Sequence, residues 1–165
     1  MFSIPELYQY MSTVRRRFIN KLSELPWEAV VKNREASFYS MRNVVIHIID
    51  NEEWIVNLGI YGKRRETKPR PGEEYTSMKM IIDHLEEVEV KTRNYLKTAD
   101  EKEFSRRADL PFPTRSINMT VEECIFQSFT EQLYHIGEII ALLWQDNVEP
   151  PPMQWFNNNP RQQAG

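Results

Sequence analysis

Apolar residues recur at intervals of three and four in four long segments of the chain, which places them on one face of an α-helix. Proline-containing polar stretches separate the segments, and the chain has only five glycines. Strands would instead show a two-residue alternation bounded by turn residues. The pattern therefore predicts an all-α fold, a four-helix bundle.

Local signals set the expected limits of the first three helices. The first should cover about residues 5–23, because proline suits the first turn of a helix and a Leu-Pro pair follows. Ser40 is a suitable N-cap for the second helix, and Gly59 and Gly62 mark its end. The third helix should start near residues 76–77.

The fourth helix has a capping box at its start, because Thr120 and Glu123 can each satisfy a backbone amide of the other. It should extend to about Asp146, since three consecutive prolines follow at 150–152. We expect one bundle domain over residues 1–148, followed by a proline-rich exit and tail over 149–165.

Two connections carry further expectations. The charged stretch 63–73 should be a solvated loop between antiparallel neighbours. Residues 100–119 form a long connection between the third and fourth helices, and their prolines exclude a continuous helix. We expect this connection to be irregular; a connection of this length is usually a functional or a crossover loop, and the sequence leaves its arrangement open.

Composition limits the classes of partner. The chain has 165 residues, 27% of them charged, and a formal net charge of −3 with both signs interspersed. The basic runs 15–17 and 63–65 are therefore expected to be solvated surface, with no nucleic-acid or membrane partner. Cys124 is the single cysteine, and the first residues lack a signal-peptide layout. We expect a cytoplasmic protein.

Glu131 and His135 stand four residues apart on a mostly apolar helix face, which brings both side chains to the same side. Burying a carboxylate with an imidazole is costly unless they bind each other, a hydrogen-bonding network or a cation. His47 occupies a similar position on the second helix. These residues predict a metal site with three ligands: His47, Glu131 and His135.

Two imidazoles and one carboxylate are typical of zinc hydrolytic sites and of facial-triad iron sites. Three protein ligands leave a coordination position open, where a water or a thiol can lose its proton near neutral pH. Two alternatives involve no metal. His47 would then be a hydrogen-bonded core histidine, and Glu131 and His135 a buried pair.

Helical spacing also places other polar and aromatic residues near the three ligands. Candidate orienting or pocket residues are Asn51, Trp54, Ser128 and Tyr134, and weak candidates for a general base are Asp50 and Glu138. Each is more commonly a surface or core residue. We expect His84 to serve packing and Cys124 to be a small core residue rather than a nucleophile.

The fourth helix carries a second apolar stripe opposite His135. It consists of Phe126, Phe129, Leu133, Gly137, Ile140 and Trp144. A bundle helix normally leaves one side to solvent, so a second apolar side requires a cover. We expect a homodimer through this face.

The chain resembles the DinB-like (DinB/YfiT) family over nearly its whole length, and two stretches carry the resemblance. One is SMRNVVIHIIDNEEW over residues 40–54; the other is EQLYHIGEIIALL over 131–143, followed by a Pro-Pro exit. The resemblance implies a four-helix bundle, often dimeric, that holds a divalent metal through three residues, usually all histidines. The chain departs from this pattern at Glu131, where histidine is usual, and at Ile136, often an arginine.

Known chemistry in that family implies a small-molecule substrate, such as a low-molecular-weight thiol. The expected function is a metal-dependent hydrolase or thiol transferase; the alternative is a non-catalytic metal-binding or stress-response bundle. A carboxylate ligand makes the site harder, which favours Fe, Mn or Ni somewhat over Zn without excluding Zn.

Overall fold

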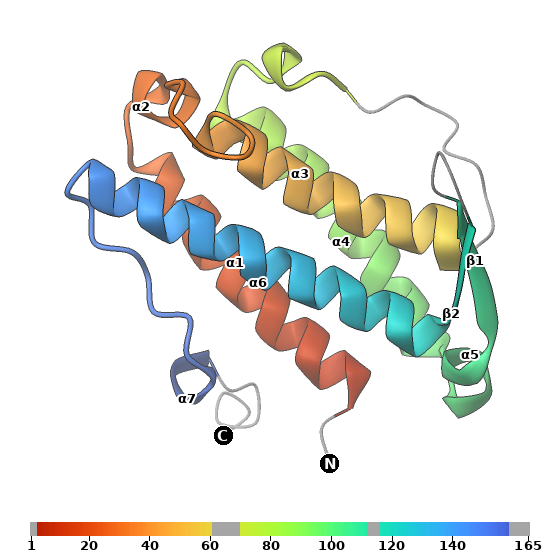
Figure 1. Cartoon of the computed structure of the whole chain (residues 1–165). Helices are drawn as coiled ribbons and strands as arrows, with labels where there is room; N and C mark the ends of the chain where they lie inside the picture. Colours follow the sequence, from red (N-terminus) through yellow and green to blue (C-terminus); the bar gives the residue numbers. More distant parts are fainter. Residues whose placement is uncertain (1–2, 61–69, 112–115, 159–165) are drawn as a thin grey trace.

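The computed structural model describes residues 3–60, 70–111 and 116–158, and within these ranges four long helices form a bundle (Figure 1). They are α1 Ile4–Ser23, α3 Met41–Trp54, α4 Met78–Thr98 and α6 Val121–Gln145. Helices α1 and α3 each pack against both α4 and α6. The predicted all-α bundle is confirmed.

Side-chain caps fix the starts of these helices. The Thr120 hydroxyl accepts a hydrogen bond from the backbone amide of Glu123, and the Glu123 carboxylate accepts one from the amide of Thr120. Ser40 and Ser77 each accept from the amide three residues further on. Each cap satisfies an amide that the first turn leaves without an intrahelical partner, so local sequence places these starts well.

Helices α3 and α4 run in the same direction, so the expectation of antiparallel neighbours is wrong. The segment before α4 lies against the start of α3, where a Cβ on Gly72 would be 2.5 Å from the Asn43 side chain. Near the far ends of both helices, the Thr92 hydroxyl donates to the Glu52 carboxylate at 2.6 Å. The 17 residues between Ile60 and Met78 can span about 55 Å, enough to return along a helix of about 32 Å. Gly62 and the 63–65 run lie outside the described residues.

The described parts of the connection between α4 and α6, residues 100–111 and 116–119, contain regular secondary structure, which corrects the expectation of an irregular loop. A short helix, α5 Glu101–Ser105, precedes strands β1 Arg107–Pro111 and β2 Ser116–Thr120, which pair antiparallel with Leu110 opposite Ile117. Ala108 and Leu110 are buried while Arg107 and Asp109 are exposed, the two-residue period of a strand. Proline excludes a helix here but is tolerated at a strand end, where Pro111 stands.

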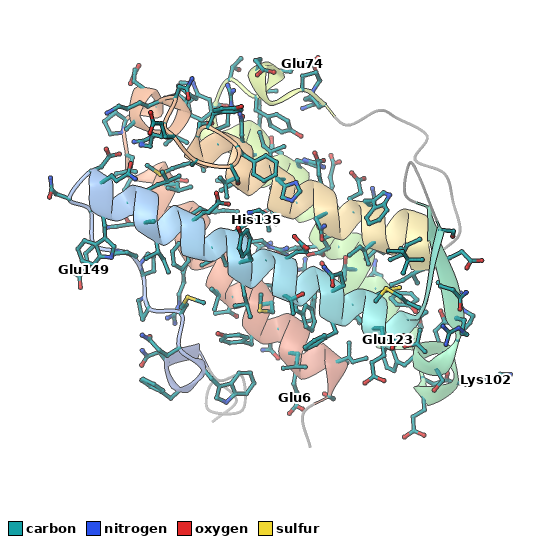
Figure 2. All side chains as sticks on the ribbon, in the orientation of Figure 1. Glu6, Glu74, Lys102, Glu123, His135 and Glu149 are labelled. Atoms are coloured by element: carbon teal, nitrogen blue, oxygen red, sulfur yellow. The ribbon has the colours of Figure 1, made fainter. Side chains whose placement is uncertain are left out.

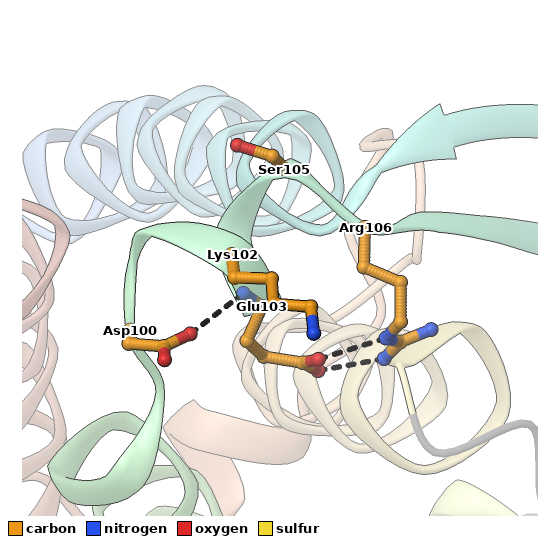
Figure 3. Close-up of a pocket in the computed structure, with 5 residues that line it drawn as sticks. All are labelled: Asp100, Lys102, Glu103, Ser105 and Arg106. Atoms are coloured by element: carbon orange, nitrogen blue, oxygen red, sulfur yellow. Dashed lines mark hydrogen bonds and ion pairs between the residues drawn. The ribbon is translucent and has the colours of Figure 1, made fainter.

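The hairpin formed by β1 and β2 stands at the end of α3 and the start of α6 (Figure 1). At its base, the Arg106 guanidinium pairs with the Glu103 carboxylate (Figure 3) and donates to the carbonyl of Ile60 at 2.6 Å. Ile60 ends a π-helical turn, Ile55–Ile60, that continues α3. A Cβ on Gly59 in this turn would lie 2.1 Å from Leu110 Cδ2, so glycine permits the close contact.

A buried polar layer divides the core into two apolar clusters. Arg15 is only 2% exposed, and its guanidinium contacts the Glu52 carboxylate at 2.5 Å and the Glu89 carboxylate at 2.9 Å. It also donates to Gln132 at 3.2 Å, so all four long helices meet here. The apolar residues on the two sides of this layer belong to separate clusters. The expectation that residues 15–17 form solvated surface is therefore wrong for Arg15, whose charge two carboxylates neutralise.

Two short helices complete the described fold, α2 Trp27–Val31 and α7 Trp155–Asn158. The Trp155 ring lies 5.0 Å from that of Tyr10, whose hydroxyl donates to the carbonyl of Met153 at 2.5 Å. The tail thus docks on α1, although Phe156 is 70% exposed. Among the described helices, none combines the length and apolar character needed to cross a bilayer.

The second apolar stripe of α6, predicted to form a dimer interface, is only partly exposed. Phe126 and Trp144 are 61% and 57% exposed, and Gly137 has open space around its Cα. Phe129 is buried, and Leu133 and Ile140 are partly buried against the chain's own core. The stripe proposed for dimerisation is thus narrower than its sequence pattern indicates, and the homodimer stays a prediction.

Candidate metal centre

Helices α3 and α6 bring three donor side chains together. His47 comes from α3, and Glu131 and His135 come from α6, with one donor atom of each lying within 4.8 Å of the others. The two imidazole rings lie 4.6 Å apart, edge to face. His135, midway along α6 (Figure 2), is 5% exposed, whereas the other two are partly exposed. The group therefore sits at the rim of the core with access from outside.

His135 is oriented by a carboxylate from its own helix. Its Nδ1 atom lies 2.6 Å from Glu138 Oε2, so a proton on Nδ1 leaves Nε2 free to bind a cation. Partial burial raises the pKa of Glu138, but hydrogen bonds from Ser37 and His135 outweigh it and the net shift is downward. Glu138 thus remains ionised and acts through His135.

Glu131 is also held by a neighbour. The Gln127 side-chain amide donates to Glu131 Oε1 at 2.8 Å, while Oε2 lies 3.6 Å from His135 Nε2. That second distance is too long for a hydrogen bond. It is close to the separation of about 3.4 Å expected for two ligands that each lie about 2.1 Å from one tetrahedral cation. The pair is therefore arranged like two ligands of a shared ion.

His47 has the properties of a neutral ligand. Within the described ranges its ring nitrogens make no hydrogen bond, and its ring stacks on Phe38 with centroids 4.2 Å apart. Burial lowers the pKa of the His47 imidazole and His135 lowers it further, while Glu131 opposes the shift. Neutral imidazole is the form that binds metals, so the donor set fits a divalent cation.

A cavity of about 370 Å³ opens beside the three donors. Its lining residues are His47, Asn51, Trp54, Ile55, Leu110, Ile117, Met119, Gln127 and Glu131. Asn51 and Trp54, predicted as pocket residues, are among them. Ser128 and Asp50 are not, and Tyr134 is 68% exposed with its ring 5.0 Å from that of His135.

Sequence reasoning missed the hairpin's contribution to this cavity. Leu110 from β1 and Ile117 and Met119 from β2 form its outer wall, and Gln127 comes from the first part of α6. The strand alternation around Leu110 and the spacing of Gln127 four residues before Glu131 were the available signals. The connection, whose arrangement the sequence left open, thus contributes a hairpin to the cavity.

The structure also gathers a second group that could hold a cation: Asp50, Glu53 and His84. His84 Nδ1 lies 2.7 Å from the Tyr75 hydroxyl and its Nε2 lies 3.4 Å from Glu53, which also pairs with Lys91 at 3.3 Å. From sequence, His84 was expected to serve packing without ligand partners, yet α3 supplies two carboxylates beside it. These contacts already occupy both ring nitrogens.

Two remaining features offer no comparable chemistry. Cys124 is fully buried, and burial together with the nearby Glu123 raises the pKa of its thiol, so it is a core residue. A shallow depression at α5 is lined by Asp100, Lys102, Glu103, Ser105 and Arg106 (Figure 3). Asp100 accepts from the Glu103 amide, and Glu103 pairs with Arg106, so these groups fasten the base of the hairpin.

A family model described as the DinB family matches residues 1–163. The chain belongs to the DinB family. Because the match spans the whole bundle, it includes α3 and α6, the two helices that supply the candidate ligands. The resemblance inferred from residues 40–54 and 131–143 is confirmed.

Solved structures of similar fold include two DinB-like proteins. The one from Bacillus cereus has a TM-score of 0.69 at 17% identity, covering 90% of this chain and 94% of its own. The one from Bacillus subtilis has a TM-score of 0.62 at 16% identity, covering 92% and 96%. A conserved protein from Enterococcus faecalis has a TM-score of 0.61 at 13% identity, covering 86% and 95%. At these identities the likeness shows the fold alone, and no curated protein matches the sequence.

Proposed function

We propose that this DinB-family protein is a metal-dependent enzyme in which His47, Glu131 and His135 hold a divalent cation. The observation that carries the proposal is the convergence of the three donor atoms within 4.8 Å, two of them on side chains held by further hydrogen bonds. Preorganised donors of this kind lower the cost of ordering a site, because the protein fixes them before the ion binds.

The chain's own residues divide the work of such a site. Glu138 accepts the Nδ1 proton of His135 and directs Nε2 toward Glu131. Gln127 holds one oxygen of Glu131 and leaves the other for the cation. These three residues would leave a bound cation one open position, and there the cation would supply a lowered pKa for a water or thiol, the chemistry that hydrolysis or thiol transfer needs. Leu110, Ile117 and Met119 of the hairpin supply apolar surface in the cavity beside that position.

The two carboxylates considered as general bases fit supporting roles better. Glu138 engages His135 and the amide of Ser37, and Asp50 belongs to the group with His84. Neither lines the cavity. The donor set of two imidazoles and one carboxylate suits Zn, Fe, Mn or Ni.

Metal titration of the purified protein tests the proposal. Wild type stripped with a chelator and titrated with Zn²⁺ and Mn²⁺ should bind one ion tightly, and His47→Ala and Glu131→Ala should each weaken binding at least tenfold. His84→Ala is the matched control, because it removes an imidazole from the second group and should leave the affinity unchanged. If only His84→Ala weakened metal binding, the ion would have to bind at the second group and not at His47.

Removing the metal separates catalysis from a purely structural role. A structural ion contributes its binding free energy directly to folding. We expect chelation to lower the midpoint of thermal unfolding only modestly while abolishing turnover of small thiols with electrophiles, or of ester substrates. Unfolding on chelation, with no metal-dependent turnover by the loaded protein, would instead favour the non-catalytic alternative.

A further inference from the structure

Asn51 presents a buried acceptor at the cavity. It lies one helical turn beyond His47 on α3 and lines the cavity beside the metal centre. Its Oδ1 atom is buried and has no hydrogen-bond partner among the described residues. An unsatisfied buried acceptor is destabilising, so an atom of this kind at a cavity requires an explanation.

The walls around that acceptor are mainly apolar. They come from three elements: Trp54 at the end of α3, Ile55 in the π-helical turn, and Leu110, Ile117 and Met119 on the hairpin. Small-molecule sites commonly combine such walls with a few polar groups that fix orientation. A volume of about 370 Å³ accommodates a molecule of modest size.

The polar groups of the cavity that lie near the metal centre determine which hydrogen-bonding group the bound molecule needs. Two acceptors lie in this lining close to the metal centre: the Asn51 oxygen, buried without a partner among the described residues, and the Glu131 carboxylate, one oxygen of which accepts from Gln127. Acceptors attract a donor, and a carboxylate repels an anion at close range. Asn51 Oδ1 therefore favours a ligand that carries a donor group, and in metal-free protein the Glu131 carboxylate disfavours an acid.

We propose that this cavity binds an uncharged organic molecule whose apolar body lies against the hairpin and whose hydroxyl, thiol or amide N–H donates to Asn51 Oδ1. The assignment deepens the proposed function and rests on it for the reacting centre, because Asn51 brings the donor group beside His47 and Glu131. Binding of the organic molecule itself requires only the cavity and Asn51, so it is measurable in metal-free protein.

Three matched probes test this chemistry: 4-butylbenzyl alcohol, its methyl ether, and 4-butylbenzoate. Their dissociation constants are measured on chelator-treated protein by amide chemical-shift titration. The alcohol should bind about two- to tenfold tighter than the ether, since one neutral hydrogen bond contributes about 0.5–1.5 kcal/mol. The carboxylate should bind most weakly. Equal binding of alcohol and ether to wild type, or tightest binding of the benzoate, would overturn the proposal.

Variants of Asn51 test whether this residue causes the preference for the alcohol over the ether. Asn51→Leu keeps the branched four-atom side chain without the acceptor and should reduce the alcohol's affinity to that of the ether. Asn51→Ala makes the same comparison if the leucine variant does not fold. Asn94→Leu, on the exposed side of α4, is the matched control and should bind like wild type. Ile117→Trp should fill the cavity and weaken all three probes at least tenfold. Persistence of the alcohol preference in both Asn51 variants would refute the role of Oδ1.

Metal titration of the same samples separates this inference from the proposed function. Asn51→Leu should retain the wild-type metal affinity, because Asn51 is not one of the three donors. If the probes discriminate but no metal binds, the metal proposal fails and the ligand class stands. If metal binds but the probes do not discriminate, the ligand class fails and the metal site stands.

Discussion

The Nδ1 atom of His135 lies 2.6 Å from a carboxylate oxygen of Glu138, one turn further along α6. This contact determines which ring nitrogen faces the other candidate ligands. The protonated Nδ1 points at Glu138, and Nε2 lies 3.6 Å from Glu131 Oε2. A single residue outside the donor set therefore fixes the orientation of the most deeply buried ligand.

Replacing Glu138 by alanine should weaken metal binding without removing a ligand. Loss of such an orienting carboxylate typically costs about 10–100-fold in metal affinity. Competition titration against a chromophoric chelator measures the effect. Glu122→Ala, an exposed acidic residue on the same helix, controls for the change in net charge. Equal affinities of the two variants would show that Glu138 does not act on the site.

Replacing Glu131 by histidine should preserve metal binding and change which metal the site prefers. A third imidazole replaces the harder oxygen donor, so the affinity for Zn²⁺ should rise relative to the affinity for Mn²⁺. The measurement is the ratio of the two dissociation constants in Glu131→His and in wild type. An unchanged ratio would mean that residue 131 does not contact the ion, and Glu131→Ala supplies the reference for a missing ligand.

The buried polar layer makes Arg15 a sensitive position. Arg15→Met would leave the Glu52 and Glu89 carboxylates buried without their shared partner, at a cost of about 3–5 kcal/mol in the free energy of unfolding. Urea denaturation measures the loss. Arg17→Met, two residues further on and contacting only a tail carbonyl at 3.5 Å among the described residues, should change stability little. A similar loss in both variants would contradict the role of the layer.

The homodimer predicted from the second stripe of α6 is tested at its exposed residues. Phe126→Asp and Trp144→Asp introduce charge where both side chains are more than half exposed, so each should shift a dimer toward monomer in sedimentation velocity while preserving the circular dichroism spectrum. Tyr39→Asp, also exposed but remote in sequence from α6, is the control. A monomeric wild type at high concentration would eliminate this interface.

Local signals account for much of the fold and for the three candidate ligands. Helix starts follow from caps, and the i, i+4 spacing of Glu131 and His135 requires a shared face. The layer around Arg15 could not be predicted, because its partners Glu52 and Glu89 lie 37 and 74 positions away. A basic side chain is predicted to be exposed as long as its partners, which are distant in sequence, are unknown.

Two further corrections have similar causes. The hairpin was missed because each strand has only two inward-facing apolar residues, Ala108 and Leu110 in β1 and Ile117 and Met119 in β2, and prolines follow Leu110. The parallel course of α3 and α4 depends on how the chain returns between them, which no local pattern specifies. The hairpin wall of the cavity, and with it Leu110 as a site residue, therefore became visible only in three dimensions.

Anomalous scattering from crystals grown with Zn²⁺ or Mn²⁺ tests the central claim most directly. We predict one strong peak about 2.0–2.2 Å from a ring nitrogen of His47, His135 Nε2 and a carboxylate oxygen of Glu131. Data collected on both sides of the metal's absorption edge identify the element. A peak only at Asp50, Glu53 and His84, or no peak at a metal concentration that saturates binding in solution, would contradict the account.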